Sequence, residues 1–335
     1  MRAGMNPIRI GLLGAGAMGA EHACCYNLID GVQVVRVYSR DLTRAAAAAK
    51  ACRAEATTDA SSLIEDPTID AVDVCLPSSL HAPFVIRALE RGKHVFCETP
   101  LTLDMGEGLR MRDAARRAGR LLQVGLLTRS ISACALVKRA AETGAHGRLL
   151  SLTTCRLGSY LREGTPDHKD HYSDPSTELM TFDFDFVGWL MGGPARLTAS
   201  PVYSQGRIGE ISALLEYDDG RSATVLASGL MPASYPFKVG FRALFQDALL
   251  ESEVVFTNAG PPRSALALFP QSGEVEFPDP AGVNPYQVEL ERFVGCVRGT
   301  ADPSLLDVER ALEALALSVA TQTSLREHRA IDVGR

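Results

Sequence analysis

The sequence lacks the features expected of a metal-binding, secreted or membrane-spanning protein. Its eight cysteines are scattered and include no CxxC pair or other metal-ligand spacing. Several lie within apolar runs, which favours buried free thiols over disulfides. No apolar run approaches the roughly 20 residues of a membrane-spanning helix, and Met1 to Pro7 lacks the apolar stretch of a secretory signal. The sequence therefore predicts a cytoplasmic protein without a bound metal.

Positive charge is also scarce. The chain has 34 Lys and Arg residues against 40 Asp and Glu residues, a formal net charge of −6. Nucleic acid and anionic membranes require a dense basic face, so neither is expected as the main partner. What the chain does have is 335 residues, of which 46% are hydrophobic. This is enough for two domains with substantial cores.

The first 127 residues alternate between short apolar runs and helix-compatible stretches. The expected strands are 8–13, 32–38, 69–76, 93–97 and 121–126, and the expected helices are 20–29, 43–53, 80–91 and 103–118. Strands that alternate with helices of this length pair in parallel through right-handed crossovers. Residues 1–127 are therefore predicted to form a Rossmann-type domain of the α/β class, with a doubly wound parallel sheet.

Residues 128–335 have a different pattern, in which strands follow one another with little helix between them. The expected strands are 149–157, 195–203, 211–217, 222–229, 237–245, 248–256 and 266–269, and the expected helices are 178–192, 284–298 and 304–326. Tyr217-Asp218-Asp219-Gly220 predicts a hairpin turn. We expect an α+β substrate and oligomerisation domain with a large, mostly antiparallel open sheet, and a last helix that packs back on the Rossmann domain. A sheet with one uncovered apolar face favours self-association.

A glycine-rich segment, Gly14-Ala15-Gly16-Ala17-Met18-Gly19, joins the first expected strand to the first helix. This is the context in which GxGxxG binds a dinucleotide. Gly14 permits the tight turn, Gly16 the close approach of the pyrophosphate, and Gly19 the packing of helix on sheet. The phosphates are then expected at the helix N-terminus, on Ala17 and Met18, and residues 1–127 are predicted to be an NAD(P)-binding Rossmann domain. The alternative is a glycine-rich turn without a ligand.

The end of the second expected strand bears on the choice of cofactor. An acidic residue there accepts hydrogen bonds from the ribose 2′-hydroxyl of NAD, whereas this chain has Ser39-Arg40, with Asp41 one position later. A guanidinium suits a 2′-phosphate. The sequence therefore favours NADP over NAD, and the alternative is a solvated Arg40 with Asp41 as the ribose ligand.

Five segments together resemble one known family. They are GLLGAGAMGAEHA (11–23), LPSSLHAPFVIRALERGKHVFCETPL (76–101), QVGLLTR (123–129), DFDFVGWLMGGP (183–194) and the C-terminal stretch 303–333. Over almost its whole length the chain is similar to the Gfo/Idh/MocA family of glucose–fructose oxidoreductases, inositol dehydrogenases and rhizopine-catabolism proteins. The resemblance implies reversible hydride transfer between NAD(P) and a hydroxyl carbon of a sugar, a cyclitol or a related small molecule. It also implies a homodimer or homotetramer formed through the C-terminal sheet.

The resemblance implies cofactor contacts and two substitutions of catalytic residues. Pro77 and His81 are expected along the nicotinamide ribose. The family's Glu-Lys-Pro is Glu98-Thr99-Pro100 here, and we expect Glu98 and Thr99 beside the cofactor. The family's Asp and His over the substrate correspond to Glu178 and Phe182. Oxidation of an alcohol needs a group that takes the hydroxyl proton, and neither threonine nor phenylalanine serves as that base.

A polar segment, residues 156–178, is the expected source of a replacement acid or base. The candidate catalytic residues are Glu178, His171 and Tyr172. The candidate substrate-binding residues are Arg129, Tyr160, Phe182 and Asp183. The alternative is an ordinary solvated loop, with Asp183 in a packing role at the start of a helix.

Three functions remain open at this point. The first is an NAD(P)-dependent oxidoreductase with a relocated proton donor, acting on a small polar carbonyl or hydroxyl compound or on an imine. The second is a redox-neutral lyase or hydrolase that uses bound nucleotide for transient oxidation. The third is a nucleotide-binding regulator without catalysis. Pocket shape depends on loops, so the sequence does not identify the substrate.

Overall fold

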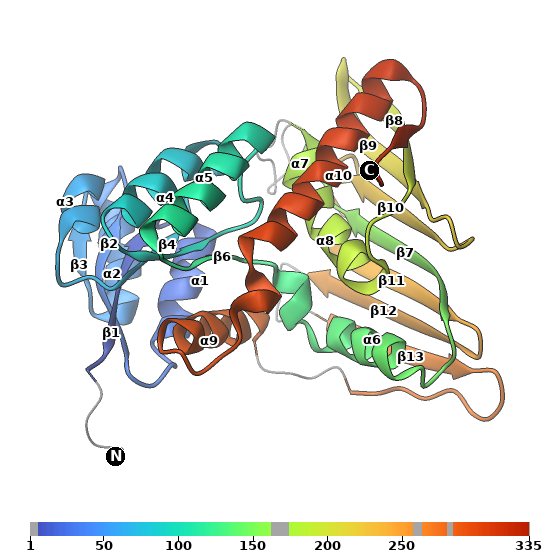
Figure 1. The fold of residues 1–335 in the computed structure, drawn as a ribbon, viewed down its shortest axis with the longest axis horizontal. Helices are drawn as coiled ribbons and strands as arrows, with labels where there is room; N and C mark the ends of the chain where they lie inside the picture. The colour runs from blue at the N-terminus through green and yellow to red at the C-terminus, as the bar shows by residue number, and fades with distance from the viewer. Residues whose placement is uncertain (1–5, 162–173, 257–262, 280–283, 335) are drawn as a thin grey trace. The chain divides into compact units, whose positions relative to one another are not determined.

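The chain divides into two compact units, each with its own hydrophobic core (Figure 1). The computed structural model describes residues 6–161, 174–256, 263–279 and 284–334. Unit 1 consists of Met1–Ser130 and Val283–Leu312, and unit 2 consists of Ile131–Gly282 and Glu313–Arg335.

Unit 1 is built on a six-stranded parallel sheet with the order β3-β2-β1-β4-β5-β6. The strands are β1 (Ile8–Leu13), β2 (Val32–Tyr38), β3 (Glu55–Thr57), β4 (Ala71–Val74), β5 (His94–Cys97) and β6 (Leu122–Val124). The central strands are nearly continuous apolar runs because helices cover both of their faces. The predicted Rossmann sheet is confirmed. The strand order reverses between β1 and β4, the point at which such sheets bind ligands.

The helices of unit 1 form two groups. In the first group α1 (Ala17–Tyr26) packs against α2 (Leu42–Cys52) and α9 (Pro285–Val297); in the second, α4 (His81–Glu90) packs against α3 (Ala60–Glu65) and α5 (Met105–Ala118). Right-handed crossovers on either side of β1 place the two groups on opposite faces of the sheet. Three short 3-10 helices complete the unit: η1 (Ser78–Leu80), η2 (Leu127–Ser130) and η3 (Pro303–Leu306).

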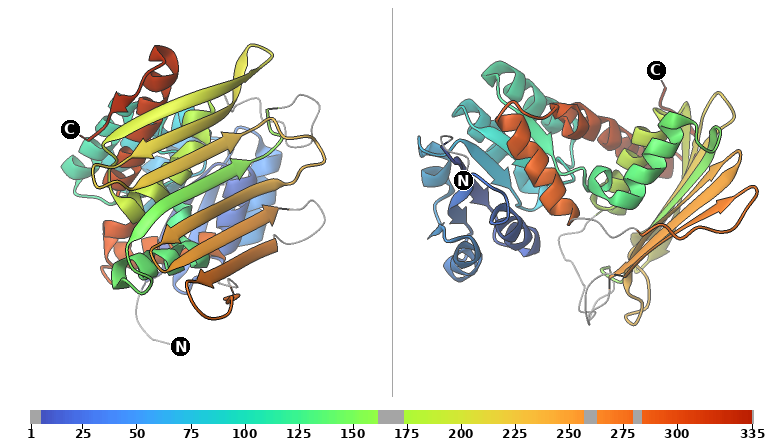
Figure 2. Two further views of the ribbon diagram at one scale, coloured as in Figure 1. Left: turned by 90° about the vertical axis from the view of Figure 1, so that its right-hand side faces the viewer. Right: turned by 90° about the horizontal axis from the view of Figure 1, so that it is seen from below.

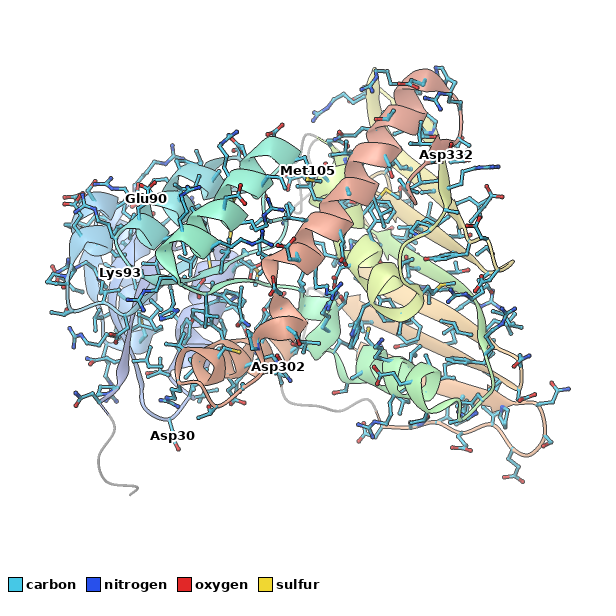
Figure 3. The ribbon with its side chains drawn as sticks, viewed as in Figure 1. Asp30, Glu90, Lys93, Met105, Asp302 and Asp332 are labelled. Carbon is cyan, nitrogen blue, oxygen red and sulfur yellow. The ribbon has the colours of Figure 1, made fainter. Side chains whose placement is uncertain are left out.

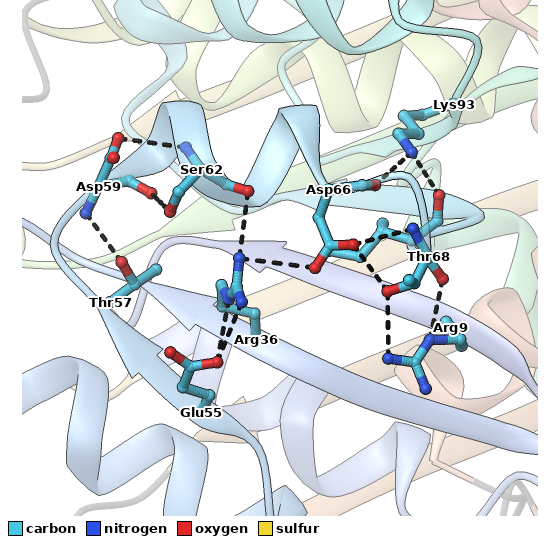
Figure 4. Close-up of polar contacts among 10 residues, drawn as sticks. Arg9, Arg36, Glu55, Thr57, Asp59, Ser62, Asp66, Thr68 and Lys93 are labelled. Atoms are coloured by element: carbon cyan, nitrogen blue, oxygen red, sulfur yellow. Dashed lines mark hydrogen bonds and ion pairs between the residues drawn. The ribbon is translucent and has the colours of Figure 1, made fainter.

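Polar side chains fasten the edge of the sheet at β3 and α3 (Figure 4). Arg36 on β2 donates to the carboxylate of Glu55 on β3 and to the carbonyl oxygen of Ser62 on α3. Lys93, which is labelled in Figure 3, donates to the carbonyl oxygens of Asp66 and Ile69 at 2.6 Å each. The sequence pattern missed both β3 and α3 because they are too short for a periodic signal, and these side-chain contacts hold them in place.

Unit 2 is built on an eight-stranded sheet with the order β13-β12-β11-β7-β10-β9-β8-β14. The strands are β7 (Leu149–Leu157), β8 (Arg196–Ser204), β9 (Arg207–Glu216), β10 (Ser222–Ser228), β11 (Phe237–Phe245), β12 (Ala248–Phe256), β13 (Arg263–Pro270) and β14 (Ile331–Asp332). The pair β7–β10 is parallel and the other pairs are antiparallel. The predicted mostly antiparallel sheet and the hairpin at Tyr217–Gly220 are therefore confirmed.

The described helices of unit 2 lie on one side of this sheet, and Figure 2 shows no described helix over its other face. They are α6 (Ser132–Thr143), α7 (Pro175–Glu178), α8 (Met180–Met191) and the part of the long α10 (Val308–Glu327) that begins at Glu313. Leu214 and Leu244 in the sheet are each 43% exposed. Self-association through this sheet stays a prediction.

Three helical features differ from the prediction. The sequence pattern missed α6 altogether. The helix expected at 178–192 corresponds to α8, and a separate short helix, α7, ends just before it at Glu178. The helix expected at 304–326 begins as η3 before α10 starts at Val308. Asp302 caps η3 and Asp307 is extended, which separates the two segments. Among the described residues, no helix combines the length and the hydropathy needed to cross a membrane.

Candidate functional site

The glycine loop follows β1 and has the steric properties that the spacing predicts. Gly14 has φ +119°, and a Cβ there would collide with the carbonyl oxygen of Cys75. A Cβ on Gly19 would collide with the carbonyl oxygen of Gly14, whereas one on Gly16 would meet no atom within 4 Å. Gly14 and Gly19 are thus required by the fold itself, while Gly16 borders open space that a ligand can approach.

The N-terminus of α1 is open toward this space. Gly16 is the N-cap residue, and no side chain caps the helix. Gly16 and Ala17 are exposed, and Met18 is partly exposed. The first amides of a helix lack partners within the helix and attract anions. A pyrophosphate of a dinucleotide therefore fits this position on the grounds of space and hydrogen-bonding capacity.

Residues 39–41 differ in their local roles. Asp41 is the N-cap residue of α2, and its carboxylate accepts hydrogen bonds from the amides of Thr43 and Arg44 at 2.8 and 3.3 Å. The amide of Ser39 donates to the carbonyl oxygen of Thr57. Arg40 is exposed, and within the described parts of the chain no ion pair holds its guanidinium. Asp41 therefore has a structural task, whereas Arg40 is available to a ligand.

The side chain of His81 is buried and contacts the backbone of two loops. Its Nε2 lies 2.7 Å from the carbonyl oxygen of Leu76, and its Nδ1 lies 3.1 Å from the carbonyl oxygens of Pro100 and Leu101. Burial lowers the pKa of the imidazole below its ordinary value, although the carbonyl groups oppose this effect. The ring is only 1% exposed, so its contact with a cofactor stays a prediction. Pro77 caps η1 at the loop that His81 braces.

Glu98, Thr99 and Pro100 form the turn after β5, with a cis bond before Pro100. The amide of Thr99 donates to Glu98 Oε2 at 3.0 Å, and the hydroxyl of Thr99 donates to the carbonyl oxygen of Gly125 at 2.7 Å. A hydroxyl fixed in this way has its proton engaged with a carbonyl group. This geometry gives no support to Thr99 as a general base.

A buried polar cluster lies behind this turn, and sequence reasoning missed most of it. His22 Nδ1 is 2.9 Å from Asp73 Oδ2, and His22 Nε2 is 2.9 Å from Glu98 Oε1. The carboxyl group of Glu289 lies in the same cluster, with ligand-type atoms within 4.8 Å of those of His22 and Glu98. A charged residue inside the apolar strand AVDV was one available signal. Another was the glutamate beside the apolar stripe of the helix 285–297.

The cluster shifts the pKa values of its members. Burial alone lowers the pKa of His22, but the neighbouring Cys75 and Asp73 raise it well above 6.5 overall. Burial and the charge of Asp73 also raise the pKa of Cys75 well above 9.0, although His22 opposes the shift. Burial and repulsion by Glu98 raise the pKa of Glu289 well above 4.5, although His22 opposes the shift.

The candidate acid–base residues and Arg129 lie in different parts of the chain. His171 and Tyr172 lie outside the described residues. Arg129, in unit 1, is buried and donates to the carbonyl oxygen of Leu305 at 3.0 Å. Glu178, the last residue of α7 in unit 2, is buried as well. Their catalytic and substrate-binding roles stay predictions.

Three substrate-binding candidates lie in unit 2. The buried carboxylate of Asp183 accepts a hydrogen bond from Arg156 at 2.9 Å. The Arg156 guanidinium stands over the ring of Phe182, 4.7 Å from its centroid. Tyr160 is buried between the backbones of Gly158 and Gly229. The structure brings Phe182 and Asp183 together around one cation, and their contact with a substrate stays a prediction.

Comparisons with known proteins agree with this geometry. An oxidoreductase family with an NAD-binding Rossmann fold, GFO_IDH_MocA, matches residues 8–126. Inositol 2-dehydrogenase 4 of Saccharopolyspora erythraea is 38% identical over 197 residues, which span 55% of this chain and about half, 54%, of that relative. The scyllo-inositol 2-dehydrogenase (NAD(+)) of Bacillus subtilis is 27% identical over 339 residues, which span 96% of this chain and 95% of that relative.

One solved structure extends the comparison to the whole fold. It is a levoglucosan dehydrogenase in complex with NADH and levoglucosan, and it superposes with a TM-score of 0.83 and 21% sequence identity. The match covers 98% of this chain and 100% of that one. Similarity at this level of identity establishes the shared fold.

Proposed function

We propose that the chain is an oxidoreductase of the Gfo/Idh/MocA family and that it transfers a hydride between NAD(P) and the hydroxyl or carbonyl carbon of a sugar- or cyclitol-like molecule. The observation that carries the proposal is the glycine loop. There Gly16 leaves open space beside helix amides that no side chain caps, while Gly14 and Gly19 allow no side chain. The substrate class follows the names of relatives, which are dehydrogenases of inositols and of levoglucosan.

For the cofactor, the proposal is NADP in preference to NAD. Three features at the end of β2 support it. Ser39 offers a hydroxyl where an acid is usual for NAD, Asp41 is engaged as the cap of α2, and Arg40 is exposed beside it. The bound nicotinamide would supply the carbon that accepts or gives the hydride. The residues of this chain would anchor the pyrophosphate at Gly16, Ala17 and Met18 and the 2′-phosphate at Arg40.

Proton transfer is the less defined half of the reaction. Thr99 holds its hydroxyl on Gly125, and Phe182 has no titratable group. We therefore keep Glu178, His171 and Tyr172 as the proposed acid–base residues. An activated carbonyl or an imine needs less help from a base than an alcohol does, and such compounds belong in the substrate screen beside inositols.

The first experiment is a fluorescence titration of the protein with NADPH and with NADH. We expect tighter binding of NADPH, and Arg40→Ala should raise its Kd by about tenfold through loss of the charge-assisted contact. The affinity for NADH should stay the same. Lys50→Ala, which removes a charge from the last turn of α2, is the matched control.

Each other outcome has a definite meaning. Tighter binding of NADH would overturn the role of Arg40. Failure of both nucleotides to bind would overturn the enzyme proposal itself. Tight binding without turnover of any cyclitol, sugar, carbonyl or imine would favour a regulator. Conversion of a substrate without any net change in absorbance at the nicotinamide band would favour a redox-neutral enzyme.

A further inference from the structure

The buried cluster around His22 carries more negative than positive charge. Asp73 and Glu289 are 0% exposed, and the Glu98 side chain is 12% exposed. Both carboxyl oxygens of Glu289 lack a hydrogen-bond partner among the described residues. A native core seldom leaves such atoms without a partner, and an isolated buried carboxylate is strongly disfavoured.

The groups that face this cluster come from every element packed around it. They are Asp73 and Cys75 on and after β4, Glu98 after β5, Glu289 on α9, and Cys25 and Tyr26 on α1 itself. The rings of Phe96 and Tyr286 close the remaining sides of His22. None of these groups has a fixed positive charge, so His22 is the one cation that they offer.

Protonation of His22 and of Glu289 reduces this excess of negative charge. With three ionised carboxylates and one imidazolium the cluster would carry a charge of −2, and a neutral Glu289 reduces this to −1. The 2.9 Å separations on both sides of the His22 ring are typical of contacts between an imidazolium and carboxylates. The Nδ1 contact is a hydrogen bond, and the Nε2 contact is an ion pair that is less well aligned. His22 therefore bridges two carboxylates as a cation, with Glu289 beside it as a neutral acid.

This bridge joins the three segments that flank the proposed cofactor position. His22 lies on α1 three residues after Gly19, at the end of the glycine loop. Asp73 and Cys75 belong to β4 and its exit, where the carbonyl group of Cys75 abuts Gly14. Glu98 accepts a hydrogen bond from the amide of Thr99 on its second carboxylate oxygen, Oε2. The hydroxyl of Thr99 in turn donates to the carbonyl oxygen of Gly125 after β6.

We propose that protonated His22 is a positioning residue that couples the glycine loop to the Glu98–Thr99–Pro100 turn, so that dinucleotide affinity follows the protonation of this cluster. The inference rests on the proposed function, since it concerns the affinity for the cofactor. Loss of the proton from His22 leaves Asp73 and Glu98 without their counter-charge and releases the turn from α1. Because the pKa of His22 is raised, the bridge is intact at neutral pH and is lost as pH rises through that value.

The test measures the Kd for NADPH from about pH 7 to about pH 10 in the full-length protein. In the wild type, Kd should rise as His22 loses its proton, by at most about tenfold per pH unit, and should level off at the value of His22→Gln. His22→Gln should already have a Kd raised by about tenfold at neutral pH, with no slope. His94→Gln, at the opposite end of β5, is the matched control and should keep the slope of the wild type.

Two further measurements keep the test informative if His22→Gln fails to fold. Glu289→Gln removes a group whose ionisation would help His22 to retain its proton, so the rise in Kd should move to lower pH. An NMR titration of the His22 ring, assigned by comparison with the variants, should give a pKa above 6.5.

Several outcomes overturn the inference. One is a wild-type Kd that stays constant over the whole pH range. Another is a slope that persists in His22→Gln. A third is a stoichiometric metal in the purified protein, which would show that a cation other than a proton neutralises the carboxylates. Failure of the proposed function looks different, because then neither nucleotide binds the wild type at any pH.

Discussion

Glu289→Gln should stabilise the protein by an amount that grows with pH. In the unfolded chain this carboxyl group ionises near its ordinary pKa of 4.5, whereas in the folded protein burial and Glu98 keep it neutral to a much higher pH. Between those two values the folded state holds one more proton than the unfolded state. The free energy of unfolding of the wild type therefore falls by about 1.4 kcal/mol per pH unit on account of this group.

The magnitude follows from the surroundings of the side chain. Glu289 is 0% exposed and neither oxygen has a hydrogen-bond partner among the described residues, so the amide loses no bond that the acid makes there. Over two pH units inside the window, the advantage of the variant should grow by about 2.7 kcal/mol.

The assay is urea unfolding followed by circular dichroism, at one-unit intervals from about pH 5 to about pH 8. Glu291→Gln is the matched control, because Glu291 lies on the same helix but is exposed and bonded to Gln287. Its unfolding free energy should run parallel to that of the wild type. Parallel curves for Glu289→Gln as well would refute the assignment of a buried neutral acid.

Three further predictions concern the loop, the turn and unit 2. Gly19→Ala should destabilise the protein by about 1–3 kcal/mol, because the added methyl group collides with the Gly14 carbonyl group. Gly16→Ala should leave the melting temperature unchanged and weaken dinucleotide binding. Thermal unfolding and nucleotide titration measure these effects, and equal melting temperatures of the two variants would contradict the steric reasoning. Thr99→Lys, which introduces a titratable amine at the turn after β5, should raise the rate of cyclitol oxidation by about a hundredfold, measured as NAD(P)H formation. An unchanged rate would mean that another residue already takes the proton. Arg156→Met should lower the free energy of unfolding by about 3–5 kcal/mol, because it leaves Asp183 buried without its partner. Adding Asp183→Asn to this variant should recover much of the lost stability, as measured in a double-mutant cycle. Additive losses from the two substitutions would argue against a coupled pair.

The fold was predictable wherever the apolar pattern is long and regular. Strands 8–13, 32–38 and 237–245 were predicted with the bounds that the structure shows, and the glycine spacing predicted where side chains are excluded. Short elements such as β3 and α3 were missed because three to six residues give no measurable period, and their side-chain anchors lie elsewhere in the chain.

The candidate site was predictable only in part, for a related reason. The loop that receives the cofactor is a contiguous motif. The cluster behind it joins residues 22, 73, 98 and 289, which no local pattern connects. His81 is the converse case: the sequence suggested a residue that contacts the cofactor, and the structure shows an imidazole enclosed by three backbone carbonyl groups. The sequence shows that such a residue is polar, but only the structure shows which groups satisfy it.

Unit 1 is made of two stretches of chain that are separated in the sequence, so its fold can be completed only after most of unit 2 has been synthesised. Residues 1–130 leave the ribosome first, yet α9 supplies Leu290 and Phe293 to their core and Glu289 to their polar cluster. Between residue 130 and α9 lies nearly the whole of unit 2. At about 5–20 residues per second, the first sheet waits roughly 8–30 s for its last helix. A chain cut before α9 would expose the apolar surface that this helix covers and become a substrate for chaperones.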